Sequence, residues 1–249
     1  MSAPIDSRNR PTNEGPLRQR WFLVSALFLV VVVLLGLLVV ITTGDDGSDT
    51  QAKNPAASPS SPASAPPAAT GSCPALKDTD ATVPSAAPQG VEWTLFHTVA
   101  LPSSEASGPA ASDGDLRRCF AHTPTGALLA AAQISTRSML AANWQQVWKR
   151  QTYGDAKEAQ LKELTKQFGT APLPQPEAGE LGQFAGFHFI TYSTDVAVID
   201  LLTRFSDGSL RVNTASLRWN GGDWQYEVSA TAQQRAVSSP EGFTSWGGV

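Results

Sequence analysis

The chain holds few residues suited to nucleophilic or metal chemistry, and two of them lie close together. Cys119 stands three positions before His122 in the segment RRCFAHTPTGALLAAAQ, residues 117–133. A thiol beside an imidazole can be a nucleophile with its base, and the same two side chains can bind zinc. On a β-strand, however, positions three apart point to opposite faces. If this segment is a strand, a direct couple between Cys119 and His122 is geometrically poor.

The role of Cys119 also depends on the compartment in which it lies. Residues 21–41, WFLVSALFLVVVVLLGLLVVI, contain no charged side chain. A helix of this length spans roughly 30 Å, the thickness of the hydrocarbon core of a bilayer. A buried core helix would show a polar stripe, and a cleaved signal peptide would have a shorter apolar run before a small-residue cleavage site. We therefore predict an uncleaved transmembrane helix over residues 21–43.

The charges that flank this helix predict its orientation. Arg18 and Arg20 precede it, whereas Asp45 and Asp46 follow it. Positively charged flanks stay in the cytoplasm. We expect residues 1–20 to form a cytoplasmic tail of a single-pass protein of the cell membrane, with everything after residue 43 on the extracytoplasmic side.

The exported part divides by composition. Residues 44–71 are rich in Pro, Ala and Ser and contain almost no large apolar residue. Such a segment cannot bury enough surface to offset its ordering entropy, so we expect a disordered stalk. A folded domain follows over residues 72–249. The net charge of the chain is −4, which argues against direct binding of nucleic acid, because that function needs a basic face.

The placement outside the membrane favours a disulfide between the two cysteines, Cys73 and Cys119. Exported domains lie in an oxidising compartment, where two cysteines most simply pair. The bridge would close a loop of about 45 residues, for which chain entropy suggests about 4 kcal/mol. Free or intermolecular cysteines, and a catalytic or metal-binding role, are the alternatives.

The first part of the domain reads as two strands and a helix. Residues 91–101 and 116–122 are strand-like runs, which we expect to pair antiparallel across a loop rich in Pro, Ser and Gly. Thr123-Pro124 is a helix start signal, with Thr as N-cap and Pro in the first turn. Helix formers then fill residues 127–142. The alternative is that residues 127–134 continue as a strand.

Two further helices are expected before the last third of the domain. Trp144, Val147 and Trp148 have the spacing of one buried helix face. Asp155 to Glu158 has the pattern of a capping box, which predicts a helix start. The helix that follows would bury Leu161, Leu164 and Phe168 on one face, would gain support from Glu158 beside Lys162, and would end at Gly169 and Pro172.

The last third predicts a four-stranded antiparallel meander. Runs 187–192, 196–205, 210–219 and 224–229 are separated by turn signals, of which Asp207-Gly208 and Asn220 to Asp223 are the clearest. In the first run, Phe187, Phe189 and Thr191 alternate with the opposite face. Helices followed by such a meander predict an α+β domain, with the helices packed on a curved antiparallel sheet of four or more strands. Its shape would be a cystatin-like or nuclear-transport-factor-like cone.

The remaining titratable residues form no recognisable catalytic or metal-binding pattern. His97, His122 and His188 are too widely spaced for a zinc site. Asp195, Asp200 and His188 are the nearest candidates for a general base in the mouth of a cone, but nothing supplies partner residues. No nucleophile elbow, phosphate-binding loop or zinc-protease motif is present. We predict no enzyme, no catalytic residue, no cofactor and no metal.

Several short motifs resemble a family of actinobacterial membrane-anchored proteins that have no established biochemical activity. The motifs are Gly90-Val91-x-Trp93, Leu101-Pro102-x-Ser104, Gly108-Pro109, Cys119 to Leu128, Trp219-x-Gly221-Gly222-Asp223-Trp224 and Trp246-Gly247-Gly248-Val249. The resemblance covers most of residues 72–249 and implies that the gene lies on an integrative conjugative element. The layout also resembles, more loosely, the bitopic inner-membrane subunits of conjugative secretion channels. No functional residue carries over from either.

These observations favour a membrane-anchored scaffold or assembly subunit of a conjugative DNA-transfer apparatus, which acts by protein–protein interaction. Its expected partners are the membrane, other transfer subunits and further copies of itself. The alternative is an extracytoplasmic ligand-binding or sensor module that uses the interior of the cone. Phe243 and Trp246, in the C-terminal segment 242–249, are candidate partner contacts. The alternative for this segment is that it packs back on the sheet.

Overall fold

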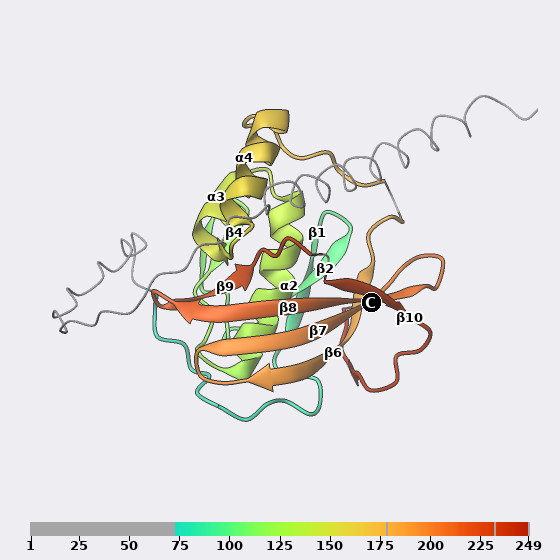
Figure 1. The fold of residues 1–249 in the computed structure, drawn as a ribbon. Coiled ribbons are helices and arrows are strands. Elements are labelled where there is room, and N and C mark those ends of the chain that lie inside the picture. Colours follow the sequence, from blue (N-terminus) through green and yellow to red (C-terminus); the bar gives the residue numbers. More distant parts are fainter. Residues whose placement is uncertain (1–72, 178, 232, 249) are drawn as a thin grey trace, which may run out of the picture. The chain divides into compact units, whose positions relative to one another are not determined.

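The computed structural model describes residues 73–177, 179–231 and 233–248. The predicted cytoplasmic tail, transmembrane helix and stalk lie outside these residues. No helix in the described part of the chain has the length and apolar character needed to cross a membrane. Figure 1 shows the arrangement of the domain's helices and strands.

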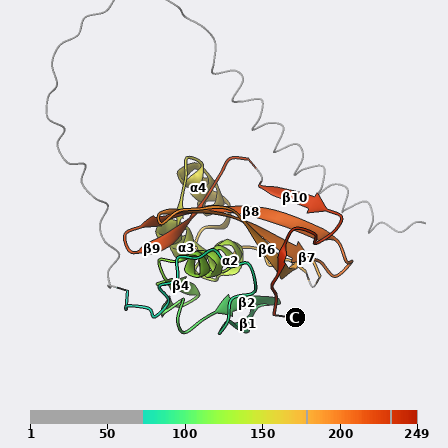
Figure 2. The same ribbon diagram turned by 90° about the horizontal axis from the view of Figure 1, so that it is seen from below.

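Helix α2, Pro124–Leu140, begins as its sequence predicts. The Thr123 hydroxyl accepts the Gly126 N–H at 3.1 Å, so Thr123 is the N-cap. Residues 127–132 have no solvent exposure, because the large sheet covers one side of α2 and the strands β1 and β2 lie on the other (Figure 2). A helix covered on both sides is apolar all round, which explains the segment ALLAAA. The helix prediction for residues 127–134 is confirmed, and the strand alternative is wrong.

Two shorter helices follow. Helix α3, Trp144–Gln151, buries Trp144, Val147 and Trp148, as the spacing predicts. Helix α4 runs from Lys157 to Phe168 and buries only Leu161 fully. The capping-box prediction is wrong, because the N-cap is Ala156 and Asp155 therefore lies outside the first turn. The helix ends as predicted, at Gly169, which takes a positive φ of 60°.

The predicted four-stranded meander is present. Its strands are β6 (Gln183–Tyr192), β7 (Val196–Arg204), β8 (Leu210–Asn220) and β9 (Asp223–Glu227), each antiparallel to the next. Gly221 and Gly222 form the two-residue turn between β8 and β9 with φ values of 63° and 88°, which other residues rarely adopt. The turn signals in the sequence are thus confirmed.

Three short strands complete this sheet to seven strands. They are β5 (Thr152–Tyr153), parallel to β9, and two antiparallel strands, β10 (Gln234–Val237) on β8 and β11 (Thr244–Ser245) on β6. The sheet is therefore mostly antiparallel, with α2 packed on β7, β8 and β9, α3 on α2 and β9, and α4 on α3. The α+β class of the domain is confirmed.

An irregularity in β6 changes the predicted alternation. The register between β6 and β7 shifts between Phe184 and Gly186 and again between Phe189 and Thr191. Phe187 and Phe189 face the core as expected, but after the second shift Tyr192 packs on the core and Thr191 is exposed. The prediction for Thr191 is wrong, because one extra residue reverses which face each side chain occupies.

The N-terminal part of the domain forms two hairpins instead of one long pair. Strand β1 (Glu92–Phe96) pairs with β2 (Val99–Ser103), and β3 (Ala111–Asp113) pairs with β4 (Leu116–Arg118). The predicted pairing of residues 91–101 with 116–122 is wrong. His97, at a φ of 53°, turns the chain back within the first run, and Cys119, at a φ of 68°, ends the second run after three residues.

Candidate functional site

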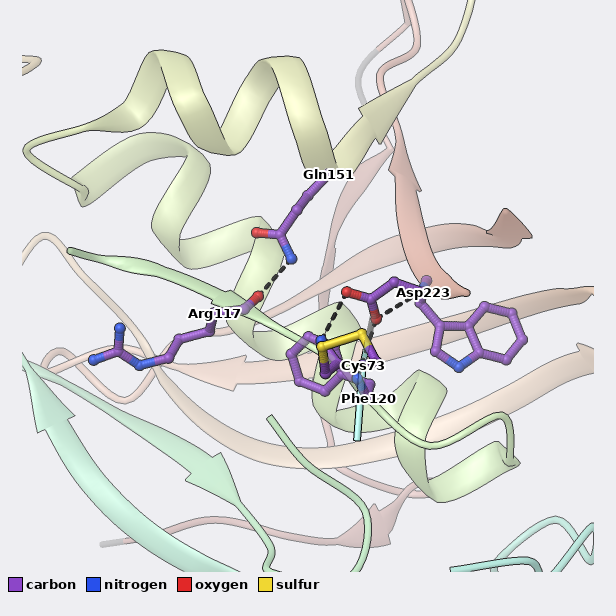
Figure 3. Close-up of a disulfide and its surroundings, with 7 residues drawn as sticks. Cys73, Arg117, Phe120, Gln151 and Asp223 are labelled. Carbon is purple, nitrogen blue, oxygen red and sulfur yellow. Dashed lines mark hydrogen bonds between the residues drawn. A yellow bond between two sulfur atoms is a disulfide. The ribbon is translucent and has the colours of Figure 1, made fainter. Parts of the chain in front are cut away.

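A disulfide and the carboxylate of Asp223 hold the segment that contains Cys119. Cys119 forms a disulfide with Cys73, with Cα atoms 5.3 Å apart, so the predicted bridge is confirmed. Both oxygens of the Asp223 carboxylate accept backbone N–H groups here, from Cys119 at 2.8 Å and from Phe120 at 3.1 Å (Figure 3). A third N–H comes from Trp224 at 3.0 Å. Burial raises the pKa of Asp223, and these three hydrogen bonds and Arg118 counter the shift only in part.

His122 lies apart from this junction. Its ring stacks on Trp219, with centroids 3.9 Å apart, and its Nε2–H donates to the carbonyl oxygen of Thr194 at 2.6 Å. The predicted strand does not extend over Cys119 and His122, because β4 ends at Arg118, so strand geometry is not what separates their side chains. The disulfide is the actual reason that Cys119 is no nucleophile, since both cysteines are oxidised.

The other candidate residues from the sequence are dispersed. His97 occupies the β1–β2 turn, and Asp195 is an exposed turn residue 3.6 Å from His122. His188 and Asp200 are cross-strand partners in β6 and β7. The buried Asp200 carboxylate accepts hydrogen bonds from Thr214 at 2.5 Å and from Arg235 at 2.8 Å. No group of three metal-ligating side chains occurs in the part of the chain that the structure describes.

The C-terminal segment packs on the sheet. Trp246 is 4% exposed and lies between Trp93, Phe184 and Phe187 in the main core. Phe243 packs on the smaller cluster on the opposite sheet face, formed by Leu202, Leu210 and Val212. The C-terminal segment thus packs back on the sheet, which was the alternative expected from the sequence. Contact of Phe243 or Trp246 with a partner stays a prediction.

A cavity of about 590 Å³ lies between the C-terminal end of α2 and the sheet. We call it the mouth cavity. Its apolar wall comes from separate elements, with Met139 and Leu140 on α2, Trp148 on α3, Phe184 on β6 and Leu201 on β7. This volume is within the range of small-molecule sites. Polar side chains, among them Ser138, Gln160 and Thr203, line the rest of the cavity.

Two polar side chains meet on the sheet wall of the mouth cavity. Asn213 on β8 donates from Nδ2 to the Tyr226 hydroxyl on β9 at 3.0 Å. Burial raises the pKa of Tyr226, so its hydroxyl stays protonated at neutral pH. The Tyr226 oxygen accepts from Asn213, and its own proton has no acceptor among the residues described here. The pair thus presents a neutral donor to whatever occupies the cavity.

Charged residues stand at the rim of the mouth cavity. The Arg211 guanidinium lies over the Phe205 ring, 4.5 Å from its centroid, and Glu180 and Glu227 also line the cavity. One cation and two anions leave no dominant sign of charge. The walls therefore suit an apolar ligand with a hydrogen-bonding group more than a strongly charged one.

Sequence reasoning missed the mouth cavity, although β8 carries a signal of it. Arg211 and Asn213 occupy the same face of β8 as the buried Ala215 and Leu217. Polar residues that continue an apolar face mark the point where the core opens. The signal is weak by itself, because such a strand end can simply reach solvent.

Comparison with known proteins places the chain in a family whose function is unknown. No curated protein matches the chain, and no solved structure does. Residues 53–245 match the model of a domain of unknown function, DUF8175. The match covers the whole region from β1 to β11, and it begins within the predicted stalk. Because it spans more than half of the sequence, the chain belongs to the DUF8175 family.

Proposed function

We propose that the chain is a membrane-anchored, extracytoplasmic binding protein that holds a small, mainly apolar ligand in the mouth cavity and performs no chemistry. The cavity of about 590 Å³ between α2 and the sheet carries this proposal. The recess opens to solvent with apolar side chains in its wall, and exposed apolar surface of this kind marks ligand-binding grooves or interaction sites.

The arrangement of polar groups supports binding over catalysis. The Asn213–Tyr226 pair offers a hydrogen bond to a ligand, with Tyr226 neutral. The buried carboxylate of Asp200 is neutralised by Arg235 and does not line the cavity. An enzyme of this shape would need an acid or base aimed into the cavity. Glu180 and Glu227 lie at the rim without a histidine or a second carboxylate hydrogen-bonded to them in the described residues.

The proposal also includes a cone-shaped fold for the domain and a position outside the cell membrane. Helices that precede a meander, with a cavity at one end of the sheet, support a cystatin-like or nuclear-transport-factor-like cone. The disulfide supports an oxidising compartment, because such bridges persist outside the cytoplasm. Together with the uncharged run over residues 21–41, this favours the orientation with the domain outside the cell membrane.

Native mass spectrometry of the full-length protein, released from its host membranes, tests the proposal. We expect a bound mass below about 1 kDa, the size that a cavity of this volume accepts. Met139→Trp should abolish the bound mass by filling the mouth, because Met139 is a cavity residue that is 55% exposed and tolerates a larger side chain. Ile190→Trp, at a similarly exposed site outside the cavity, is the matched control. A ligand-free wild type, or a bound mass that survives Met139→Trp, contradicts the proposal.

A second candidate is an assembly subunit of a conjugative DNA-transfer apparatus. The resemblance to actinobacterial proteins of integrative conjugative elements favours it, and so does the sheet face opposite α2. On that face Ile190 and Val196 are 54% and 44% exposed. A photo-crosslinking residue at Ile190, with one at Val83 as control, tests it in the host. Recovery of another transfer subunit from position 190 alone supports this role, and recovery of none with the transfer genes expressed contradicts it.

A further inference from the structure

A second cavity, of about 360 Å³, lies between the two N-terminal hairpins and α2. Its residues come from β1 and β2, from the stretch 109–112, and from Arg117, Gln133 and Arg137. The only charged side chains among them are the two arginines. The cavity is separate from the mouth cavity, with which it shares no residue.

Arg137 is an unusual residue for a domain core. It is 5% exposed, yet no carboxylate oxygen lies within 4.0 Å of its guanidinium in the described part of the chain. Neutral acceptors hold it instead. Its Nε donates to Gln133 Oε1 at 2.6 Å, and its Nη1 donates to the Asp115 carbonyl at 2.8 Å. The ring of Phe96 lies against the guanidinium, 4.0 Å from it.

Arg117 adds a second positive charge to the same cavity. Its Nη1 donates to the carbonyls of Gly114 at 2.7 Å and Leu116 at 3.3 Å, and no described carboxylate pairs with it. Burial, followed by the nearby charge of Arg117, lowers the pKa of Arg137 to about 10, and Asp115 opposes the shift. Arg137 thus stays charged at neutral pH, and the charge of Arg117 repels it.

An unpaired guanidinium in a protein interior is costly, and a second one beside it adds to the cost. Arginine also presents several donors in a fixed plane that matches carboxylate and phosphate oxygens. On Arg137, Nη2 has no hydrogen-bond acceptor among the described residues. This arrangement leaves donors and charge for an anion that the chain itself does not supply.

We propose that this cavity binds an organic oxyanion, a carboxylate or a phosphate that carries an apolar group. Arg117 and Arg137 hold the oxyanion. Leu95, which is 67% exposed at the rim, and Phe96 contact the apolar group. The hydroxyl groups of Ser103 and Ser112 also line the cavity and add neutral donors.

Calorimetric titration of the full-length protein in detergent tests this site with three probes: inorganic phosphate, acetate and hexanoate. Chloride at equal ionic strength gives the baseline. Saturable binding of hexanoate, tighter than that of acetate, identifies a carboxylate with an apolar group. Saturable binding of phosphate that exceeds both identifies a phosphate ester. Absence of saturable binding for all three overturns the proposal.

Variants distinguish anion binding in this cavity from nonspecific attraction of anions to the positive charges of the protein. Arg117→Gln should weaken binding at least about tenfold, the scale of a lost charged hydrogen bond. Arg117→Lys keeps the charge but loses the planar set of donors, so it should weaken binding less than Arg117→Gln does. Arg204→Gln, at an exposed arginine outside the cavity, is the matched control and should bind as the wild type. Met139→Trp, which fills the mouth cavity, should also leave binding unchanged. Equal weakening by Arg117→Gln and Arg204→Gln contradicts the proposal.

Discussion

Asp223 is the residue on which the junction at Cys119 most depends. Its two carboxylate oxygens accept three backbone N–H groups. In Asp223→Asn one of these oxygens becomes an NH2 donor, so at least one N–H loses its acceptor. We expect the free energy of unfolding, measured with denaturant, to fall by about 1–3 kcal/mol. Asp155→Asn, at an exposed position, should change it by less than about 0.5 kcal/mol. Equal effects would mean that Asp223 does not hold the junction.

The disulfide makes a separate prediction at the same scale. It joins residues 46 positions apart, and chain entropy assigns about 4 kcal/mol to such a bridge. We expect the double variant Cys73→Ser, Cys119→Ser to lose about 2–4 kcal/mol of stability, as read from its denaturant midpoint. A reducing agent should lower the midpoint of the wild type and leave that of the double variant unchanged. An insensitive wild type would show that the bridge contributes nothing.

Strand β10 depends on an ion pair that connects it to the centre of the sheet. Burial raises the pKa of Asp200, but the hydrogen bonds from Arg235 and Thr214 outweigh it, so the pKa is lowered overall. A lowered carboxyl pKa stabilises the fold above the ordinary value of about 4, and the contribution disappears as the pH falls through the lower folded value.

We therefore expect Arg235→Gln to cost roughly 1–2 kcal/mol at pH 7, less than for a fully buried pair because Arg235 is about half exposed. The difference from wild type should begin to shrink below about pH 4 and should fade as the pH passes through the lowered pKa of Asp200 in the folded state. Unfolding curves at pH 7 and pH 3 check this. A difference that stays constant between the two pH values would refute the role of the ion pair.

Strand β11 owes its position to Trp246. Trp246→Ala should cost about 3–5 kcal/mol of stability, because a large buried side chain is lost. The buried Trp246 Nε1 has no hydrogen-bond partner among residues 73–177, 179–231 and 233–248, so Trp246→Phe removes an unsatisfied donor and should cost much less. Thermal unfolding of both variants measures this. A stability unchanged by Trp246→Ala would instead favour a segment that contacts a partner.

Capping and turn residues in the sequence correctly predicted where helix α2 begins and where the strands of the meander end. Thr123-Pro124 marks the start of α2, and the turn residues after Asn220 and Arg204 mark the ends of the meander strands. Strands β5, β10 and β11 are two to four residues long and exist only through pairing with longer strands, so no periodicity reveals them. The positive φ of His97 divides a run that alternates like one strand, and its residue type gives little warning of that.

At the scale of the whole molecule, the candidate sites were less predictable than the fold. The mouth cavity draws Met139, Asn213 and Tyr226 from three elements, and only the packing of α2 on the sheet brings them together. Arg117 and Arg137 likewise meet through tertiary structure. The disulfide was predictable because the sequence contains two cysteines, which leave a single pairing within the chain. The dispersed candidates, Asp195, Asp200 and His188, show that titratable residues in sequence do not locate a pocket.

The mouth cavity is proposed to hold a small ligand in the full-length protein. A photo-crosslinking residue no larger than methionine, placed at position 139 of the full-length chain and illuminated in host cells, tests it without filling the cavity. Mass spectrometry should then detect an adduct below about 1 kDa on the peptide around position 139. The same residue at Val83, an exposed apolar position outside the cavity, should give none. The absence of an adduct at position 139, or the same adduct at both positions, would contradict the claim.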